Sequence, residues 1–60
     1  MPNGFTDANG LSVKEGDEVE YQDGRRGILT YCGHDGAALV KFAGHEEDVN
    51  WRNLCGVPNG

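Results

Sequence analysis

Apolar side chains at every second position, interrupted at short intervals by glycine-containing turns, are the feature that most restricts the fold of this chain. Over residues 17–22, Val19 and Tyr21 alternate with acidic and amide side chains, and later segments repeat the pattern. A period of two is typical of a strand with one solvent-exposed face. Apolar residues do not keep the three-to-four-residue spacing of a helix over any segment. Glycines such as those in 23–24 and 33–36 supply tight turns. The pattern therefore predicts an all-β domain.

The alternation predicts five short antiparallel strands, at 17–22, 27–32, 37–42, 47–51 and 55–57, with a 3₁₀ turn at 52–54. Residues 1–10 are mostly turn formers, with Phe5 as their one aromatic side chain, so we expect a flexible N-terminal arm there. We expect the folded domain at 11–57 and a C-terminal tail at 58–60. Sixty residues make one domain that buries only about 60% of its surface, which leaves little room for an enclosed active site.

The predicted strands carry their glycines and apolar residues in a recognisable order: Lys14-Glu15-Gly16-Asp17-Glu18-Val19-Glu20-Tyr21, Arg26-Gly27-Ile28, Leu39-Val40-Lys41-Phe42, Val49 and 54–57. This order resembles the SH3-like β-barrels of KOW and Tudor type, in which a Gly-Asp-x-Val strand precedes a glycine-led strand and a Val-x-Phe strand. The resemblance implies a small five-stranded antiparallel SH3-like barrel with a 3₁₀ turn before its last strand, acting as a binding module. The chain departs from the KOW pattern at Glu15, Glu18 and Glu20, where KOW domains are commonly basic.

The register between the second and third predicted strands leaves two arrangements open. An even connection places Leu29 and Tyr31 on one face with the apolar residues 38, 40 and 42, whereas an odd connection or a bulge leaves Leu29, Tyr31 and Leu39 together outside. In either register one face carries more apolar side chains than a solvated surface needs. This excess predicts either a strongly coiled barrel that buries parts of both faces or a surface for a partner or a second copy.

We expect a small cytosolic binding or adaptor module that recognises a protein partner, or itself, through the sheet formed by the second and third predicted strands. Trp51 is included because large aromatic side chains anchor many interfaces. The size of the chain is that of accessory proteins encoded by phages or mobile elements. The predicted partner-binding residues are Leu29, Tyr31, Leu39 and Trp51, flanked by Glu46, Glu47 and Asp48.

Nucleic-acid binding is the first alternative function, although a net charge of −5 disfavours it because phosphate backbones are negative. A KOW-like domain would use four of the basic side chains, which are Arg25, Arg26, Lys41 and Arg52. The acidic runs at 15–23 and 46–48 support a second alternative, an acidic mimic of a nucleic-acid backbone.

Two ligand sites are conceivable from residue types alone. Tyr21, Tyr31, Phe42 and Trp51 would serve as an aromatic cage for a methylated cation, although a small domain needs its few aromatic residues for its core. A zinc set would comprise Cys32, His34, His45 and Cys55, but its spacing matches no standard zinc motif. We therefore predict no metal and no cofactor, and two reduced thiols.

The sequence carries no motif of an enzyme: it has a single serine, no phosphate-binding loop and no dinucleotide fingerprint. No apolar run approaches the roughly 18 residues of a membrane span, and the first residues lack the layout of a signal peptide. We therefore expect a non-enzymatic, cytoplasmic protein that does not act at a membrane.

Overall fold

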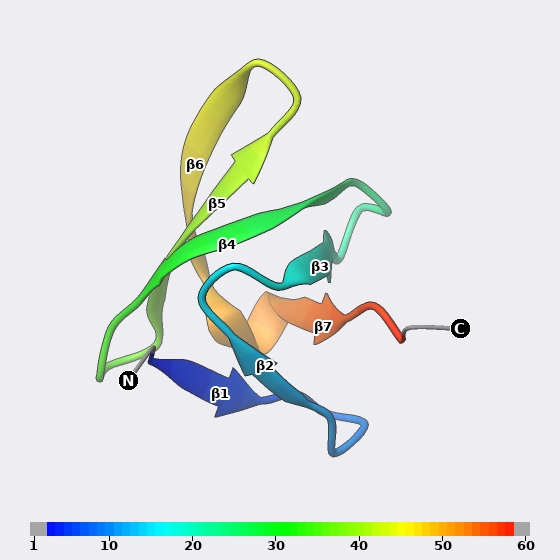
Figure 1. Ribbon diagram of the computed structural model, residues 1–60, viewed down its shortest axis with the longest axis vertical. Coiled ribbons are helices and arrows are strands. Elements are labelled where there is room, and N and C mark those ends of the chain that lie inside the picture. The colour runs from blue at the N-terminus through cyan, green and yellow to red at the C-terminus, as the bar shows by residue number, and fades with distance from the viewer. Residues whose placement is uncertain (1–2, 59–60) are drawn as a thin grey trace.

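The computed structural model describes residues 3–58, which form an all-β domain of seven short antiparallel strands and one 3₁₀ turn (Figure 1). A two-stranded sheet pairs β1 with β2, and a five-stranded sheet has the order β6-β5-β4-β3-β7. The elements are β1 (Gly4–Thr6), β2 (Ser12–Lys14), β3 (Glu18–Tyr21), β4 (Arg26–Cys32), β5 (Ala37–Phe42), β6 (His45–Asn50), η1 (Trp51–Asn53) and β7 (Leu54–Gly56).

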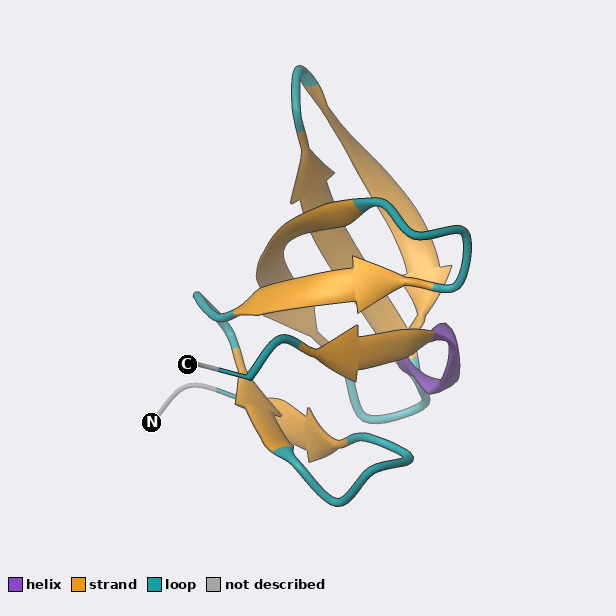
Figure 2. Ribbon diagram, turned by 90° about the vertical axis from the view of Figure 1, so that its right-hand side faces the viewer, coloured by secondary structure: helices purple, strands orange, loops and turns teal. Residues whose placement is uncertain are grey.

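The five-stranded sheet is a meander from β3 to β6, after which η1 turns the chain back so that β7 pairs with β3 (Figure 2). Asn50 caps η1, because its side-chain oxygen accepts the N–H of Arg52 at 2.9 Å. The all-β class, the five predicted strands and the 3₁₀ turn before the last one are thus observed, with boundaries that differ from the predicted ones by at most two residues. The sheet is coiled, but no ladder joins β6 to β7 within residues 3–58, so closure into a barrel is not observed.

The N-terminal segment differs from the expected flexible arm, because β1 and β2 form a hairpin packed on the larger sheet. Phe5 is only 7% exposed and its ring centroid lies 5.2 Å from that of Trp51. Gly10 has a φ of +84°, which glycine adopts readily, and it completes the turn between the two strands. The core therefore recruits residues 4–14, while positions 1–2 of the expected arm and 59–60 of the expected tail lie outside the described residues.

A β-bulge in β4 decides which side chains enter the core. Leu29 pairs with Val40, but Tyr31 rather than Thr30 pairs with Leu39, so one extra residue shifts the alternation. Leu29 is fully buried, whereas Tyr31, two residues later, is 48% exposed. The structure therefore follows neither of the two expected registers throughout, since Leu29 faces inward and Tyr31 faces outward. The buried apolar residues are Phe5, Val13, Val19, Leu29, Cys32, Ala38, Val40, Phe42 and Leu54.

Candidate functional site

The surface of β4, β5 and β6 that points away from the core has an apolar centre, and we call this surface the outer face. Ile28 pairs with Lys41, and Tyr31 pairs with Leu39. Because residues directly opposite each other in a ladder point to the same side, all four belong to the outer face. Ile28 is 43% exposed, Tyr31 is 48% exposed and Leu39 is half-buried. The outer face thus leaves more large apolar surface in water than any other strand surface of the described residues.

Acidic side chains flank this apolar centre on both sides. On the β3 side, Glu18 lies opposite Ile28. On the β6 side, Glu46 lies opposite Lys41 and Asp48 lies opposite Leu39. The outer face therefore combines exposed apolar groups with Lys41 and Arg26, the latter paired with Glu20, and it has acidic side chains along both flanks.

Three of the predicted partner-binding residues, Leu29, Glu47 and Trp51, do not lie on the outer face. Leu29 is buried in the core, and Glu47 lies opposite inward-facing Val40. The carboxylate of Glu47 accepts from Arg25 Nη1 at 2.6 Å and Nη2 at 3.3 Å, and it lies 2.6 Å from His45 Nε2. These bonds, that of Arg25 first, lower the pKa of Glu47 to about 2. Glu47 therefore ties the β3–β4 turn to β6 rather than facing a partner.

The four aromatic residues considered for a cage are split among three places. Tyr21 and Phe42 pack edge to face with centroids 6.2 Å apart, and the guanidinium of Arg25 lies 4.4 Å from the Phe42 centroid and 5.6 Å from that of Tyr21. The protein's own cation thus occupies the aromatic pair. Tyr31 lies on the outer face and Trp51 against Phe5, so no single cage forms among the described residues.

Trp51 does not lie on the outer face, although it was predicted to bind the partner together with Tyr31 and Leu39. It packs half-buried against the core on the inner side, and its Nε1 is buried with no hydrogen-bond partner among the described residues. Trp51 borders two small hollows, one of about 190 Å³ next to Asp35 and Gly36 and one of about 240 Å³ next to Thr6 and Ala8. Trp51 therefore contributes to the junction of η1, β1 and the β4–β5 turn.

The four basic residues considered for nucleic-acid binding are dispersed, and two of them are ion-paired. Arg25 Nε lies 2.6 Å from Asp23, and the bonds to Glu47 and Asp23 raise the pKa of Arg25. Arg26 Nε lies 3.3 Å from Glu20. Lys41 is on the outer face beside Ile28, and Arg52 is in η1. These side chains do not gather into one basic strip.

The residues considered for zinc are likewise not brought together. Among residues 3–58, no group of three or more His, Cys, Asp or Glu side chains is placed to hold a metal ion. Cys32 is buried below the β4 bulge, and its burial, followed by the charge of Glu15, raises the pKa of its thiol. His45 bonds Glu47 at the other end of the sheet, and Cys55 is half-buried in β7.

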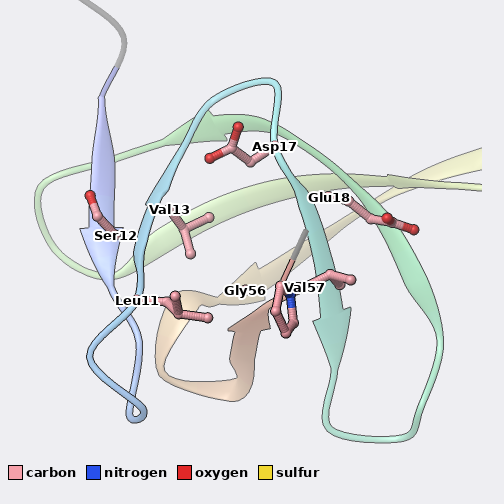
Figure 3. Close-up of a pocket in the computed structure, with 8 residues that line it drawn as sticks. Leu11, Ser12, Val13, Asp17, Glu18, Gly56 and Val57 are labelled. Atoms are coloured by element: carbon pink, nitrogen blue, oxygen red, sulfur yellow. The ribbon is translucent and has the colours of Figure 1, made fainter. Parts of the chain in front are cut away.

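A shallow hollow of about 220 Å³ lies between β2 and the end of β7, bordered by β3 (Figure 3). Leu11 and Val13 point into it, while the side chain of Glu18 extends away from it. Asp17 is engaged locally, because its Oδ2 accepts the N–H of Lys14 at 3.0 Å. Polar and apolar groups of the described residues line the hollow together, and this lining indicates no particular ligand.

Comparisons with known proteins do not assign the chain to a family. No family model, curated protein or solved structure matches it. Within residues 3–58 there is also no helix whose length and apolarity would suffice to cross a membrane.

Sequence reasoning missed the separation of Glu47 from Glu46 and Asp48. The period of two that predicted this strand also assigns Glu47 to the face opposite that of its two neighbours.

Proposed function

We propose that this protein is a small protein-binding module of the SH3-like barrel type, and that it recognises its partner through the outer face. The observation that carries the proposal is the exposed apolar centre of Ile28, Tyr31 and Leu39 between two acidic margins. A surface of this kind fits a partner with an apolar centre and a basic rim. The SH3-like assignment is supported by the meander of four strands, the 3₁₀ turn and the return of β7 beside β3.

The charge pattern favours a different protein over a second copy of this one. A two-fold contact between two outer faces would bring the margins of Glu18, Glu46 and Asp48 against acidic margins of the same sign. Like charges placed together oppose association, and the net charge of −5 adds to this repulsion. The engagement of Arg25 and Arg26 in ion pairs weighs in the same way against a nucleic-acid partner.

A random peptide library panned against the immobilised protein tests this proposal. We expect enrichment of peptides that combine apolar side chains with Lys or Arg, and a loss of affinity of about tenfold or more with Tyr31→Thr. Threonine keeps a residue suited to strands while removing the aromatic ring. Gln22→Thr, in the exposed turn after β3, is the matched control and should leave affinity unchanged.

Two results would overturn the proposal. One is selection of peptides that bind the Tyr31→Thr and Gln22→Thr variants equally well. The other is a salt-sensitive gel shift with random RNA or DNA that disappears in the double variant Arg25→Glu/Arg26→Glu, since this would make nucleic acid the primary partner.

A further inference from the structure

The edge strand β6 is the longest unpaired strand edge in the described structure. It has six residues, and its only ladder partner within residues 3–58 is β5 (Figure 1). The opposite edge, β7, has three residues, and the N–H of its Gly56 donates to the Asp7 carboxylate at 2.8 Å. The β7 edge is thus short, and one of its main-chain N–H groups already has an acceptor. The β6 edge is longer, and it has no strand beside it within the described residues.

The register of the β5–β6 ladder identifies which main-chain groups face this open side. Trp51 N–H donates to Gly36 O at 2.8 Å, one position beyond the pair of Ala37 and Asn50. Bonded and non-bonded pairs alternate in an antiparallel ladder, so Glu47 and Val49 exchange bonds with β5 while Glu46 and Asp48 do not. A side-chain bond supports this assignment of bonded and non-bonded pairs. Thr30 Oγ1 donates to Leu39 O, so the carbonyl of Leu39 points toward β4 and not toward its β6 neighbour Asp48. The N–H and C=O groups of Glu46 and Asp48 consequently point away from the sheet.

The side chains at these same two positions carry negative charge on the outer face. Glu46 lies opposite Lys41 and Asp48 opposite Leu39. A strand added to β6 would place two of its residues, spaced by two, directly beside Glu46 and Asp48. Lys or Arg at those positions would meet an opposite charge, and the residue between them would point inward, toward Glu47 and Val49.

Charge on an edge strand also restricts which strands can pair with it. Antiparallel pairing of two β6 edges from two copies would set the carboxylates of Glu46 and Asp48 in one copy beside those of Glu46 and Asp48 in the other. The acidic edge thus excludes a second copy and selects a strand of opposite sign. Leu39 adjoins Asp48, so the added strand would extend the outer face rather than form a separate surface.

We propose that β6 accepts an extended basic peptide segment of the partner as an additional antiparallel strand, with Lys or Arg at alternate positions. Main-chain bonds to Glu46 and Asp48 supply the attachment, and the carboxylates of these residues select the basic side chains. The inference rests on the proposed function, because it specifies how the partner of the outer face would dock.

The probe for this proposal is a synthetic Lys-Val-Lys-Val-Lys-Val peptide with blocked ends, added to the isotope-labelled protein. Amide hydrogen exchange followed by NMR should slow by about tenfold or more at Glu46 and Asp48 at saturation, because each N–H gains an acceptor. The matched control is a Glu-Val-Glu-Val-Glu-Val peptide, which should not slow exchange. In antiparallel addition the Lys amides face β6, so N-methylation of the Lys residues should abolish the effect, whereas N-methylation of the Val residues should preserve it.

Charge reversal of the protein provides the second arm. Glu46→Lys/Asp48→Lys should weaken binding of the basic peptide by about fivefold or more, and its unfolding midpoint, measured beside that of the wild type, checks that it is folded. Tyr31→Thr should retain the exchange protection by this peptide, which contacts β6 alone. Loss of library binding with Tyr31→Thr, combined with no protection at β6, would therefore refute strand addition while leaving the proposed function intact.

Two results overturn the proposal of strand addition. The first is unchanged exchange at Glu46 and Asp48 in the presence of the basic peptide at millimolar concentration. The second is equal protection by the two N-methylated peptides, because this would show that charge alone, without main-chain pairing, holds the peptide.

Discussion

The carboxylate of Asp7 accepts the main-chain N–H of Gly56 at 2.8 Å, and this bond joins the first hairpin to the last strand. The other oxygen of Asp7 accepts the N–H groups of Asn9 and Leu11 at 2.9 and 2.8 Å, so one side chain both shapes the β1–β2 turn and attaches it to β7. This relation explains why an acidic residue is buried in the domain.

Replacement of Asp7 should detach the hairpin. Asp7→Ala removes the acceptor for three N–H groups, so we expect a lower urea midpoint and faster hydrogen exchange at Leu11 and Gly56. Asp7→Asn should be less damaging at the turn, because its amide oxygen still accepts from Asn9 and Leu11. Ser12→Ala, on the exposed side of β2, is the control. Unchanged exchange at Gly56 in Asp7→Ala would contradict this role.

The free energy of unfolding should fall in acid, in part because the Glu47 carboxylate becomes protonated. The hydrogen bonds from Arg25 and His45 lower its pKa from 4.5 to about 2. A carboxyl with a lowered pKa in the folded state contributes stability that is fully present above pH 4.5 and is lost as the pH falls toward 2. The urea midpoint of Glu47→Gln should therefore depend less on pH in this window than that of the wild type. Glu46→Gln is the control, because the Glu46 carboxylate accepts from the Thr30 hydroxyl and forms no ion pair within residues 3–58. Parallel pH profiles for wild type and Glu47→Gln would refute the assignment.

The alternation of β4 before its bulge predicts unequal losses of stability for two adjacent apolar residues, Ile28 and Leu29. Leu29→Ala empties a fully buried position and should destabilise the protein by about 2–5 kcal/mol, which is enough to unfold a domain of this size in large part. Ile28→Ala removes an exposed side chain and should cost less than about 1 kcal/mol. Urea denaturation of both variants measures the difference, and equal losses would mean that the inward and outward assignments are wrong.

The acidic margins predict a monomer. Sedimentation equilibrium should give a single mass near 6.5 kDa up to millimolar concentration at low ionic strength, where repulsion between like charges is least screened. A concentration-dependent dimer that Tyr31→Glu abolishes would instead show that the outer face binds a second copy.

The four longer strands of the large sheet, β3 to β6, were predictable because each carries two or more inward side chains between turn residues. Val19 with Tyr21, and Ala38 with Val40 and Phe42, repeat the period of two often enough to be recognised. The three-residue strands β1 and β2 each carry a single inward side chain, Phe5 or Val13, and one residue defines no period.

The candidate surface was predictable only in part. Tyr31, Leu39, Glu46 and Asp48 do lie on one face, but Leu29 does not, because the extra residue at Thr30 reverses the alternation within β4. A bulge leaves no mark in composition, so its position was accessible only from the ladder itself. Trp51 was misplaced for a related reason, since its long side chain packs on Phe5, a residue assigned to the arm.

The pairing of β7 with β3 has a consequence for synthesis on the ribosome. Val19 pairs with Gly56, so the central sheet cannot be completed until the segment Leu54–Gly56 has left the exit tunnel. Before that point the chain can form at most the meander of β3 to β6, in which the edges of β3 and β6 are both unpaired. Folding to completion is thus a late event, which begins with the emergence of β7 and is slowed by the long loop that this contact closes.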